Sequence, residues 1–395
     1  MHEKLRFRVG FLALVFAAGL AHAASDDNSQ TTAAIPDGPG AVTFPGGDRY
    51  AGGFKGGKPD GQGTLAYANG DRYTGFFKAG VFSGQGAMAF SSGEKYAGEF
   101  RDGQPNGKGE FTDAKGNVYA GEFKDGQLNG QGTLTITGGN KYTGEFKDTV
   151  PNGKGTMVYE NGNAYTGDFR DGRANGQGTL TVHNGNIYVG GFKDDQFSGK
   201  GTLSYADGSQ YAGEFVDGMP TENGKLTLPT GAEYIGEFKD GFPDGRGTLT
   251  FADEARYVGE FKGGYPTGNG TLTYANGDKY VGGFNFGSEQ PTGKGTMTFA
   301  DGKVYSGEFK DALANGKGTL KYPGGGEYAG DFKDGEPDGK GTLTYANGDK
   351  LTGEFKNGQA NGKGTLYSAG GAVKQSGVWK DAKLVQATAS SPAGN

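Results

Sequence analysis

The sequence of 395 residues contains no cysteine and only three histidines, His2, His22 and His183. Without cysteine there is no disulfide framework and no thiolate metal site, and three histidines leave little for acid–base catalysis. Tryptophan occurs once, but 27 phenylalanines and 21 tyrosines exclude the aromatic-poor composition of a disordered chain. Glycine takes 82 positions, roughly three times its usual share of about 7 %, without the strict Gly-x-y period of collagen. Such a chain folds around glycine and aromatic rings.

The N-terminus has the pattern of a secretory signal peptide. Three basic residues within positions 4–8 precede the apolar residues 9–20, and Ala21-His22-Ala23 has the form of a small-residue cleavage site. The apolar stretch is too short to span a hydrocarbon core, which needs about 20 residues. We therefore expect residues 1–23 to be removed and the mature chain to be exported, to the periplasm or outside the cell. Residues 24–35 are predicted to be a polar linker, and residues 385–395 a flexible tail.

The net charge argues against two kinds of partner. The full chain carries −6. Residues 1–23 contribute Lys4, Arg6 and Arg8 against Glu3, a net of +2, so the mature chain carries −6 minus +2, or −8. An acidic protein without a basic cluster is a poor candidate for nucleic acid, and for simple attraction to anionic lipid.

A single unit is repeated through the rest of the chain. The motif Tyr-x-Gly-x-Phe starts at thirteen tyrosines from Tyr50 to Tyr328, and Leu351 replaces the tyrosine of a fourteenth copy. Twelve of the thirteen intervals are 23 residues long, and one, which contains the residues 285–290, is 25. Half a copy precedes the first unit at residues 37–44, and a degenerate copy follows at Gln375 to Trp379. The period predicts a tandem array of identical structural elements.

Each unit has the alternation of a β-hairpin with one apolar and one polar face. In the first unit the apolar face would carry, from both strands, Tyr50, Gly52, Phe54, Gly61, Gly63 and Leu65. Proline recurs five residues after the phenylalanine, as at Pro59, which predicts a four-residue loop over 56–59 with the proline outside the ladder and Phe54 opposite Gly61. The next connection, residues 68–70, predicts a three-residue loop.

The last residue of that three-residue loop is expected to have a positive φ. Thirteen of fourteen units have glycine three residues before the motif, as at Gly70, and Glu254 is the exception. Glycine is the residue that adopts positive φ without strain. We therefore expect Glu254 to be held in a strained conformation.

The unit resembles the MORN repeat, the membrane occupation and recognition nexus motif. Residues 96–103, YAGEFRDG, followed by Gly107-Lys108-Gly109, are typical of it. The chain departs from many family members in having Phe where they have Trp, and Asn or Asp where they have His. The resemblance implies an all-β, elongated, single-layer antiparallel array of hairpins in a twisted sheet, here over residues 36–384 with about 14 repeats and degenerate caps. It also implies self-association, and roles in membrane attachment or protein contacts.

No constellation of residues points to catalysis, a metal or a cofactor. His183 lies one residue before an Asn-Gly turn, and its neighbouring units keep the repeat, so no Ser-His-Asp site surrounds it. Asn152 to Thr156 lacks the spacing and the following helix of a phosphate loop. Loop carboxylates lack the density of a calcium loop. Glutamate recurs at one polar-face position in eight units, as at Glu99, which marks a surface and not an active site. The sequence predicts a protein that is not an enzyme.

The repeated aromatic rings are the remaining candidate for function. They form either the core of the array alone, or a core with a groove that stacks on glycan rings or holds acyl chains. The candidate binding face near the middle of the array consists of Tyr142, Phe146, Tyr165, Phe169, Tyr188, Phe192, Tyr211 and Phe215. Two functions stay open. One is a non-catalytic exported scaffold at the cell envelope that binds a protein partner or itself as a homodimer. The other is an envelope protein that binds membrane lipid or glycan through the aromatic face.

Overall fold

The computed structural model describes residues 35–287 and 290–388. The predicted signal peptide, nearly all of the predicted linker and the last residues of the predicted tail lie outside the described residues. The described part contains 31 β-strands and no helix, which confirms the all-β prediction. The chain divides into two compact units, Met1–Ala206 and Asp207–Asn395.

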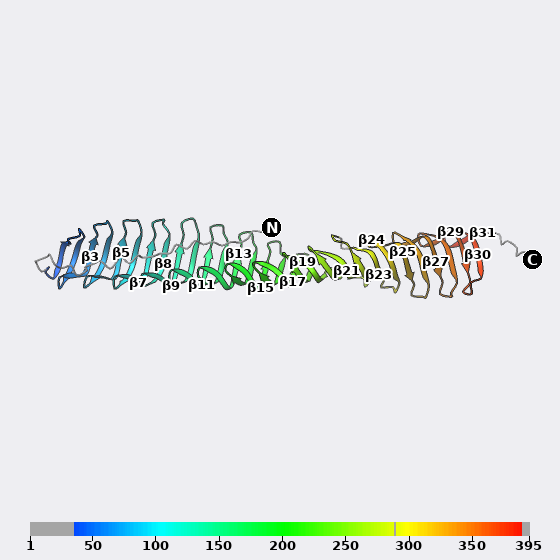
Figure 1. The fold of residues 1–395 in the computed structure, drawn as a ribbon, viewed down its shortest axis with the longest axis horizontal. Coiled ribbons are helices and arrows are strands. Elements are labelled where there is room, and N and C mark those ends of the chain that lie inside the picture. Colours follow the sequence, from blue (N-terminus) through cyan, green and yellow to red (C-terminus); the bar gives the residue numbers. More distant parts are fainter. Residues whose placement is uncertain (1–34, 288–289, 389–395) are drawn as a thin grey trace, which may run out of the picture. The chain divides into compact units, whose positions relative to one another are not determined.

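The first unit holds fifteen strands that follow one another along the sheet (Figure 1). They are β1 (Gly38–Thr43), β2 (Arg49–Lys55), β3 (Lys58–Ala66), β4 (Arg72–Lys78), β5 (Val81–Ala89), β6 (Lys95–Arg101), β7 (Gln104–Thr112), β8 (Val118–Lys124), β9 (Gln127–Thr135), β10 (Lys141–Lys147), β11 (Val150–Val158), β12 (Ala164–Arg170), β13 (Arg173–Thr181), β14 (Ile187–Lys193) and β15 (Gln196–Ser204).

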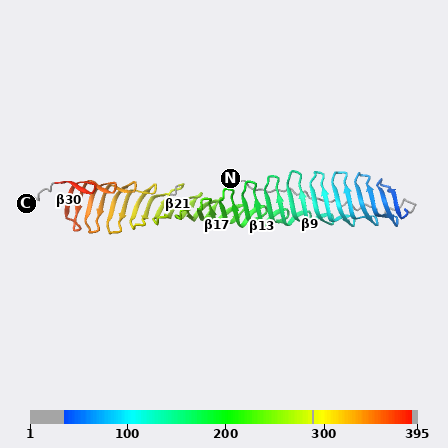
Figure 2. The ribbon, with the colours of Figure 1, turned by 180° about the vertical axis from the view of Figure 1, so that it is seen from behind.

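The second unit continues with the same kind of hairpin, as the view from behind also shows (Figure 2). Its strands are β16 (Gln210–Val216), β17 (Met219–Thr227), β18 (Glu233–Lys239), β19 (Phe242–Thr250), β20 (Arg256–Lys262), β21 (Tyr265–Thr273), β22 (Lys279–Phe284), β23 (Pro291–Thr298), β24 (Val304–Lys310), β25 (Leu313–Lys321), β26 (Glu327–Lys333), β27 (Glu336–Thr344), β28 (Lys350–Lys356), β29 (Gln359–Tyr367), β30 (Val373–Lys380) and β31 (Lys383–Ala387).

Within each unit, strands that are neighbours in the chain pair antiparallel. In the first complete hairpin Tyr50 lies opposite Leu65 and Gly52 opposite Gly63, as the alternation of the sequence predicts. The predicted half copy at the N-terminus is β1, which pairs with β2. At the other end β31 extends to Ala387, three residues past the array boundary expected at residue 384.

The predicted loop between the two strands of each hairpin is wrong. The turn has two residues, not four, and Phe54 lies opposite Pro59, which is part of the ladder. Gly61 instead lies opposite Phe77 of the next strand. The turn residues both have positive φ, as in Asp102 (51°) and Gly103 (82°), which is the type I′ geometry that matches the twist of the flanking strands.

Proline is tolerated in this ladder because its nitrogen faces the next hairpin's turn. Where Ala174 occupies the position, its N–H donates to the Asp195 side chain at 2.8 Å. Where proline occupies it, as at Pro59, only the carbonyl is used, and it accepts a hydrogen bond from the Gly80 N–H at 2.8 Å. Proline therefore costs no ladder hydrogen bond at this position.

A bulge restores the register that the shorter turn would otherwise shift by two residues. Between the pairs Gly52–Gly63 and Phe54–Pro59 one residue on β2 faces three on β3, so β3 carries two extra residues. Two is one full side-chain period of a strand. The predicted faces therefore hold although the predicted loop does not.

The three-residue loop between hairpins is confirmed. The Gly70 N–H donates to the Tyr67 carbonyl at 3.0 Å, and the Tyr67 N–H donates to the Asp71 carbonyl at 2.9 Å. Gly70 has φ 95°, and Glu254, the exception, is held at φ 70°. The strain expected at Glu254 is present.

Within each unit the core is a row of rings on the apolar face. The Tyr50 ring packs edge-on against Phe54 of its own unit at 5.0 Å and against Phe77 of the next unit at 4.9 Å. It lies over Gly52 and Gly63, where an added Cβ would overlap its hydroxyl. That hydroxyl donates to the Gly53 carbonyl at 2.9 Å. Every motif tyrosine is at most 2 % exposed, so the apolar face is buried within a single chain.

Candidate binding surfaces

The aromatic residues that the sequence singled out lie in this core. Tyr142, Tyr165, Tyr188 and Tyr211 are 0 to 2 % exposed, and Phe146, Phe169, Phe192 and Phe215 are 1 to 5 % exposed. Successive rings touch, as in Tyr142 with Phe169 at 4.9 Å and Tyr165 with Phe192 at 4.8 Å. A ligand reaches these rings only if the hairpins separate. The surface open to a partner is elsewhere.

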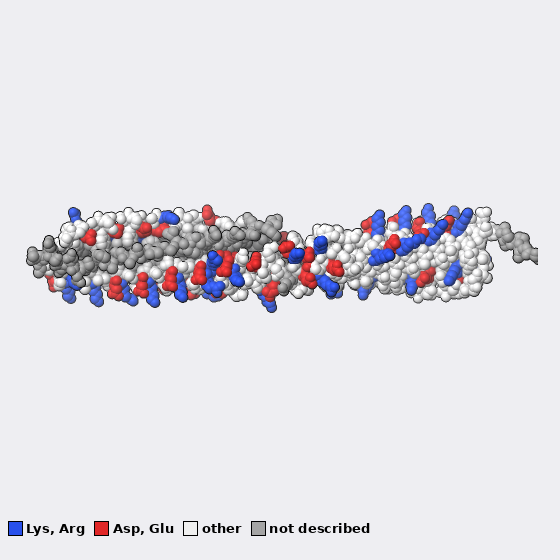
Figure 3. Space-filling view, viewed as in Figure 1, with Lys and Arg blue, Asp and Glu red and all other residues white. Residues whose placement is uncertain are grey.

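We call the opposite side of the sheet the outer face. It is lined by the polar positions of each hairpin, and hydroxyls meet across neighbouring hairpins, as Thr156 and Thr166 do at 3.0 Å. Acidic and basic side chains alternate along one edge of the first unit and do not gather into a patch of one sign (Figure 3). This edge of the first unit therefore offers many weak polar contacts, whereas Lys and Arg side chains gather in a row over the second unit (Figure 3).

The repeated carboxylate on this face has a structural role. The Glu145 side chain folds over the bulge glycine Gly153 of its own hairpin and accepts the Lys154 N–H at 3.1 Å. In other units aspartate does the same, as Asp168 does from the Gln177 N–H at 3.0 Å. A hydrogen bond from the Lys154 side chain and this N–H lower the pKa of Asp168. These carboxylates stabilise the bulge and are not an acid–base pair.

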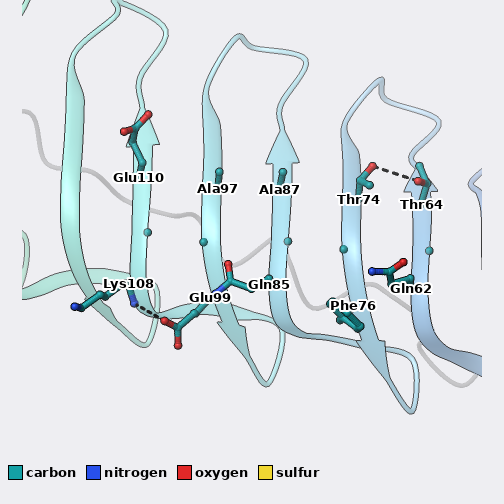
Figure 4. Close-up of a pocket in the computed structure, with 15 residues that line it drawn as sticks. Gln62, Thr64, Thr74, Phe76, Gln85, Ala87, Ala97, Glu99, Lys108 and Glu110 are labelled. Carbon is teal, nitrogen blue, oxygen red and sulfur yellow. Dashed lines mark hydrogen bonds between the residues drawn. The ribbon is translucent and has the colours of Figure 1, made fainter.

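A hollow of the outer face lies in the first unit, over β3 to β7, with a volume of about 920 Å³. Its floor is glycine backbone, and Phe76, 43 % exposed, stands where most units have a carboxylate. Ala87 and Ala97 replace the threonine pair that is seen at Thr64 and Thr74 (Figure 4). The hollow therefore lies where several residues depart from the repeat.

A second departure from the repeat lies in the second unit. Apolar side chains are exposed at the turn end of five consecutive hairpins on the outer face, and we call these residues the apolar row: Val216 (56 % exposed), Phe242 (57 %), Tyr265 (48 %), Phe286 (61 %) and Leu313 (48 %). The Tyr265 and Phe286 rings touch edge-on at 5.8 Å. Phe286 belongs to the two-residue insertion that breaks the period. Sequence reasoning did not identify this row, although three of its residues, Phe242, Tyr265 and Leu313, each lie eight positions after a motif tyrosine.

His183 has a structural partner. Its backbone N–H donates to the Asn163 side-chain oxygen at 2.9 Å, and its ring Nδ1 lies 3.2 Å from the same atom. Asparagine or aspartate links successive loops in the same way in other units, as Asn186 does with the Ala206 N–H at 3.0 Å. The histidine therefore sits in a repeated loop contact.

Over residues 35–287 and 290–388 no three His, Asp or Glu side chains are grouped so that they could hold a metal ion. The same residues contain no helix with the length and apolar character needed to cross a membrane.

The architecture is that of a tandem β-hairpin repeat protein. The family model described as MORN repeat matches residues 50–72, 73–95, 96–118, 119–141, 142–164, 165–187, 188–210, 211–233, 234–256, 257–279, 289–304, 305–327, 328–350 and 352–373. The chain belongs to the MORN repeat family, as the sequence resemblance predicted. No curated protein matches the sequence.

Solved structures give only distant similarity. The TCP10 domain of Danio rerio CPAP has a TM-score of 0.29 and 17 % identity, with 57 % of this chain and 99 % of that chain covered. The TCP domain of Drosophila melanogaster SAS-4, solved with a proline-rich motif of Ana2, has a TM-score of 0.26 and 15 % identity, with 39 % and 83 % covered. TM-scores this low carry no information about the ligand or partner of this chain.

Proposed function

We propose that this protein is a non-catalytic repeat scaffold that binds partner proteins through its outer face. The observation that carries the proposal is the separation of the two faces. The side chains of the aromatic face are buried in the core. The outer face carries small and polar side chains that recur along the length of each unit. Repeat arrays with a self-contained core commonly use such an extended surface for binding.

The second function considered is lipid or glycan binding through the aromatic face. In this arrangement the aromatic face is not accessible to such a ligand. The rings that would stack on sugars or hold acyl chains are at most 5 % exposed among the eight candidates. We therefore retain the protein-binding scaffold, with self-association as one form of it.

In-cell photocrosslinking from neighbouring positions tests this proposal. A photoreactive residue at Thr166, which is exposed, reports on the outer face, and the same residue at the buried Tyr165 reports on the core. We expect discrete protein adducts from position 166 and none from position 165. Adducts from neither position, or mainly from position 165, would contradict binding through the outer face.

We further propose that the scaffold acts at the cell envelope after export. The basis is the signal-peptide pattern of residues 1–23. Intact-mass measurement of the protein from its native host is expected to give a chain that begins at Ala24. A full-length chain that remains inside the cell would refute export and leave the binding proposal untouched.

A further inference from the structure

Three residues of the hollow over β3 to β7 depart from the repeat. Ten of the fourteen units have a carboxylate at the position of Phe76, and eleven have threonine at the position of Ala87 and Glu110. The backbone of the hairpin is unchanged, since its bulge lies between Gly75 and Phe77 as it does at the same place in the next unit. The fold therefore does not require these three residues.

Phe76 removes a contact that other units use. In the next unit the Glu99 side chain accepts a hydrogen bond from the Lys108 N–H at 3.3 Å. Phe76 has no side-chain oxygen with which to accept one from the Gln85 N–H. Its ring covers the bulge glycine Gly84, where an added Cβ would lie 3.7 Å from the Phe76 Cβ, and stays 43 % exposed. Losing an acceptor does not stabilise the hairpin, and the exposed part of the ring gains nothing from burial. The fold therefore does not account for Phe76.

The hollow is a trough that runs across the strands. Gln62, Phe76, Gln85 and Glu99 follow one another on β3 to β6 and form one side, and a second row of side chains lies two residues away along each strand (Figure 4). Two residues of a strand span about 6.7 Å, and the four spacings between β3 and β7 add up to about 19 Å. The trough is therefore about three times as long as it is wide.

The exposed ring of Phe76 lies among groups that bind hydroxyls. Gln62 is its cross-strand partner on β3, and Gln85 lies opposite Glu99. A glutamine amide both donates and accepts hydrogen bonds, and the carboxylate of Glu110 accepts from two donors. The negative face of an aromatic ring attracts polarised C–H groups. A sugar ring has C–H groups on its faces and hydroxyls on its rim, so this combination fits a saccharide.

The trough suits a peptide or an anionic chain less well. The strands β4, β5 and β6 are each paired on both edges, so an extended peptide would find no ladder partners for its own N–H and C=O groups. Glu99 and Glu110 outnumber Lys108 among the charged residues of the lining, which disfavours an anionic chain. A neutral ligand whose polar groups are hydroxyls matches the lining.

We propose that the trough binds a neutral glycan chain of β-1,4-linked hexoses. One sugar ring stacks on Phe76, and its hydroxyls form hydrogen bonds with Gln62 and Gln85. A β-1,4 linkage gives a flat, extended chain that follows a straight trough, whereas an α-1,4 linkage gives a coiled one. The site lies on the outer face, apart from the buried rings of the core, and adds a class of ligand to the partner proteins of the proposed function.

Isothermal titration calorimetry of the full chain with two β-1,4-linked hexasaccharides tests the proposal. Cellohexaose has a hydroxyl and chitohexaose an acetamido group at C2, so the pair distinguishes two sources of such a chain. We expect saturable binding of at least one of them and no comparable binding of the α-1,4-linked maltohexaose. Binding of neither β-linked chain, or equal binding of maltohexaose, would overturn the inference.

Variants locate the site. Phe76→Glu gives this unit the carboxylate of the repeat and is expected to weaken binding roughly tenfold or more. Its thermal midpoint should stay the same or rise, because a carboxylate at this position accepts the Gln85 N–H. Phe76→Tyr keeps the ring and should keep binding. Unchanged affinity in Phe76→Glu, or lost affinity in a folded Phe76→Tyr, would refute the inference.

The matched control removes an exposed apolar side chain elsewhere on the outer face. Ile235, in the second unit, is 56 % exposed, and other units have threonine at its position, as at Thr166. Ile235→Thr is expected to leave the affinity for the hexasaccharide unchanged. An equal loss in Ile235→Thr and Phe76→Glu would show that binding does not depend on the trough, against the inference.

A protein occupant of the trough would give a different result. A photoreactive residue at the exposed Ala87 would then form protein adducts that an excess of either hexasaccharide does not reduce, and the glycan would be replaced by a protein. Thr166 lies outside the trough, so photocrosslinking there tests the scaffold function separately. Protein adducts at position 166 without hexasaccharide binding would overturn only the glycan inference.

Discussion

Replacing Glu254 by glycine should stabilise the protein by about 1 kcal/mol. Glu254 is exposed and ends a three-residue loop with φ 70°, where its N–H donates to the Phe251 carbonyl at 3.0 Å. An L-residue in this region costs about 1–2 kcal/mol, whereas glycine loses about 0.5–1 kcal/mol more backbone entropy on folding. The difference leaves a gain of about 0.5–1 kcal/mol, which corresponds to roughly 1–4 °C for a unit of this size.

The thermal midpoint of the second unit's transition measures this effect, and hydrogen exchange of peptides that cover Phe251 reports it locally. The matched control is Gly231→Glu in the preceding loop, where φ is 89° and an added Cβ meets no atom within 4 Å. It should lower the midpoint by a similar amount, since only the backbone conformation changes. A midpoint that falls on Glu254→Gly, or that rises on Gly231→Glu, would refute the reasoning about this loop.

Three further predictions concern the turn, the core and the tyrosine hydroxyls. Thr149→Gly should raise the thermal midpoint by a few degrees, because Thr149 has φ 72° in a two-residue turn and a β-branched residue is strained there; an unchanged midpoint would contradict this. Gly178→Ala should cost about 1–3 kcal/mol in urea unfolding, because the added Cβ would lie 2.5 Å from the Tyr165 hydroxyl, whereas Gly324→Ala, in open space, should be neutral. Burial raises the pKa of Tyr257 to about 12, above its unfolded value of about 10. The neutral form is therefore favoured in the folded state, and its contribution is complete below pH 10 and lost between about pH 10 and 12. Tyrosinate absorbance and the midpoint, followed together, should change in that window, and ionisation of all tyrosines near pH 10 in the folded chain would oppose it.

The sequence supports the fold prediction wherever two signals agree. The 23-residue period and the alternation within each unit together give the pairing of Tyr50 with Leu65, because a shift of one residue would turn every ring outward. The predicted hairpin turn is wrong because a recurrent proline usually lies outside a ladder, whereas a pair such as Asp102-Gly103 is a strong signal for a two-residue type I′ turn. The position of Pro59 depends on the neighbouring hairpin, and the pattern of a single unit does not contain that information.

The burial of the aromatic face also depends on more than the sequence of a single unit. The sequence shows that Tyr165 and Phe169 share a face, but whether that face is covered depends on how strongly successive hairpins twist and curve. In the structure each ring is enclosed by its own phenylalanine and by that of the next unit, so the array needs no second layer. The eight candidate residues are therefore part of the core, and none of them is more than 5 % exposed.

In a periodic array, the residues that the fold requires and the residues that a function requires occupy different positions. A residue that most units repeat, such as the tyrosine over its two glycines or the carboxylate over its bulge, is accounted for by the fold of the unit. A residue that departs from the repeat without disturbing the pairing is not accounted for in this way. Phe76 and the apolar row are such departures, and both lie on the outer face. Binding specificity in this protein is therefore expected where the period is broken, and the insertion that carries Phe286 is the largest break it has.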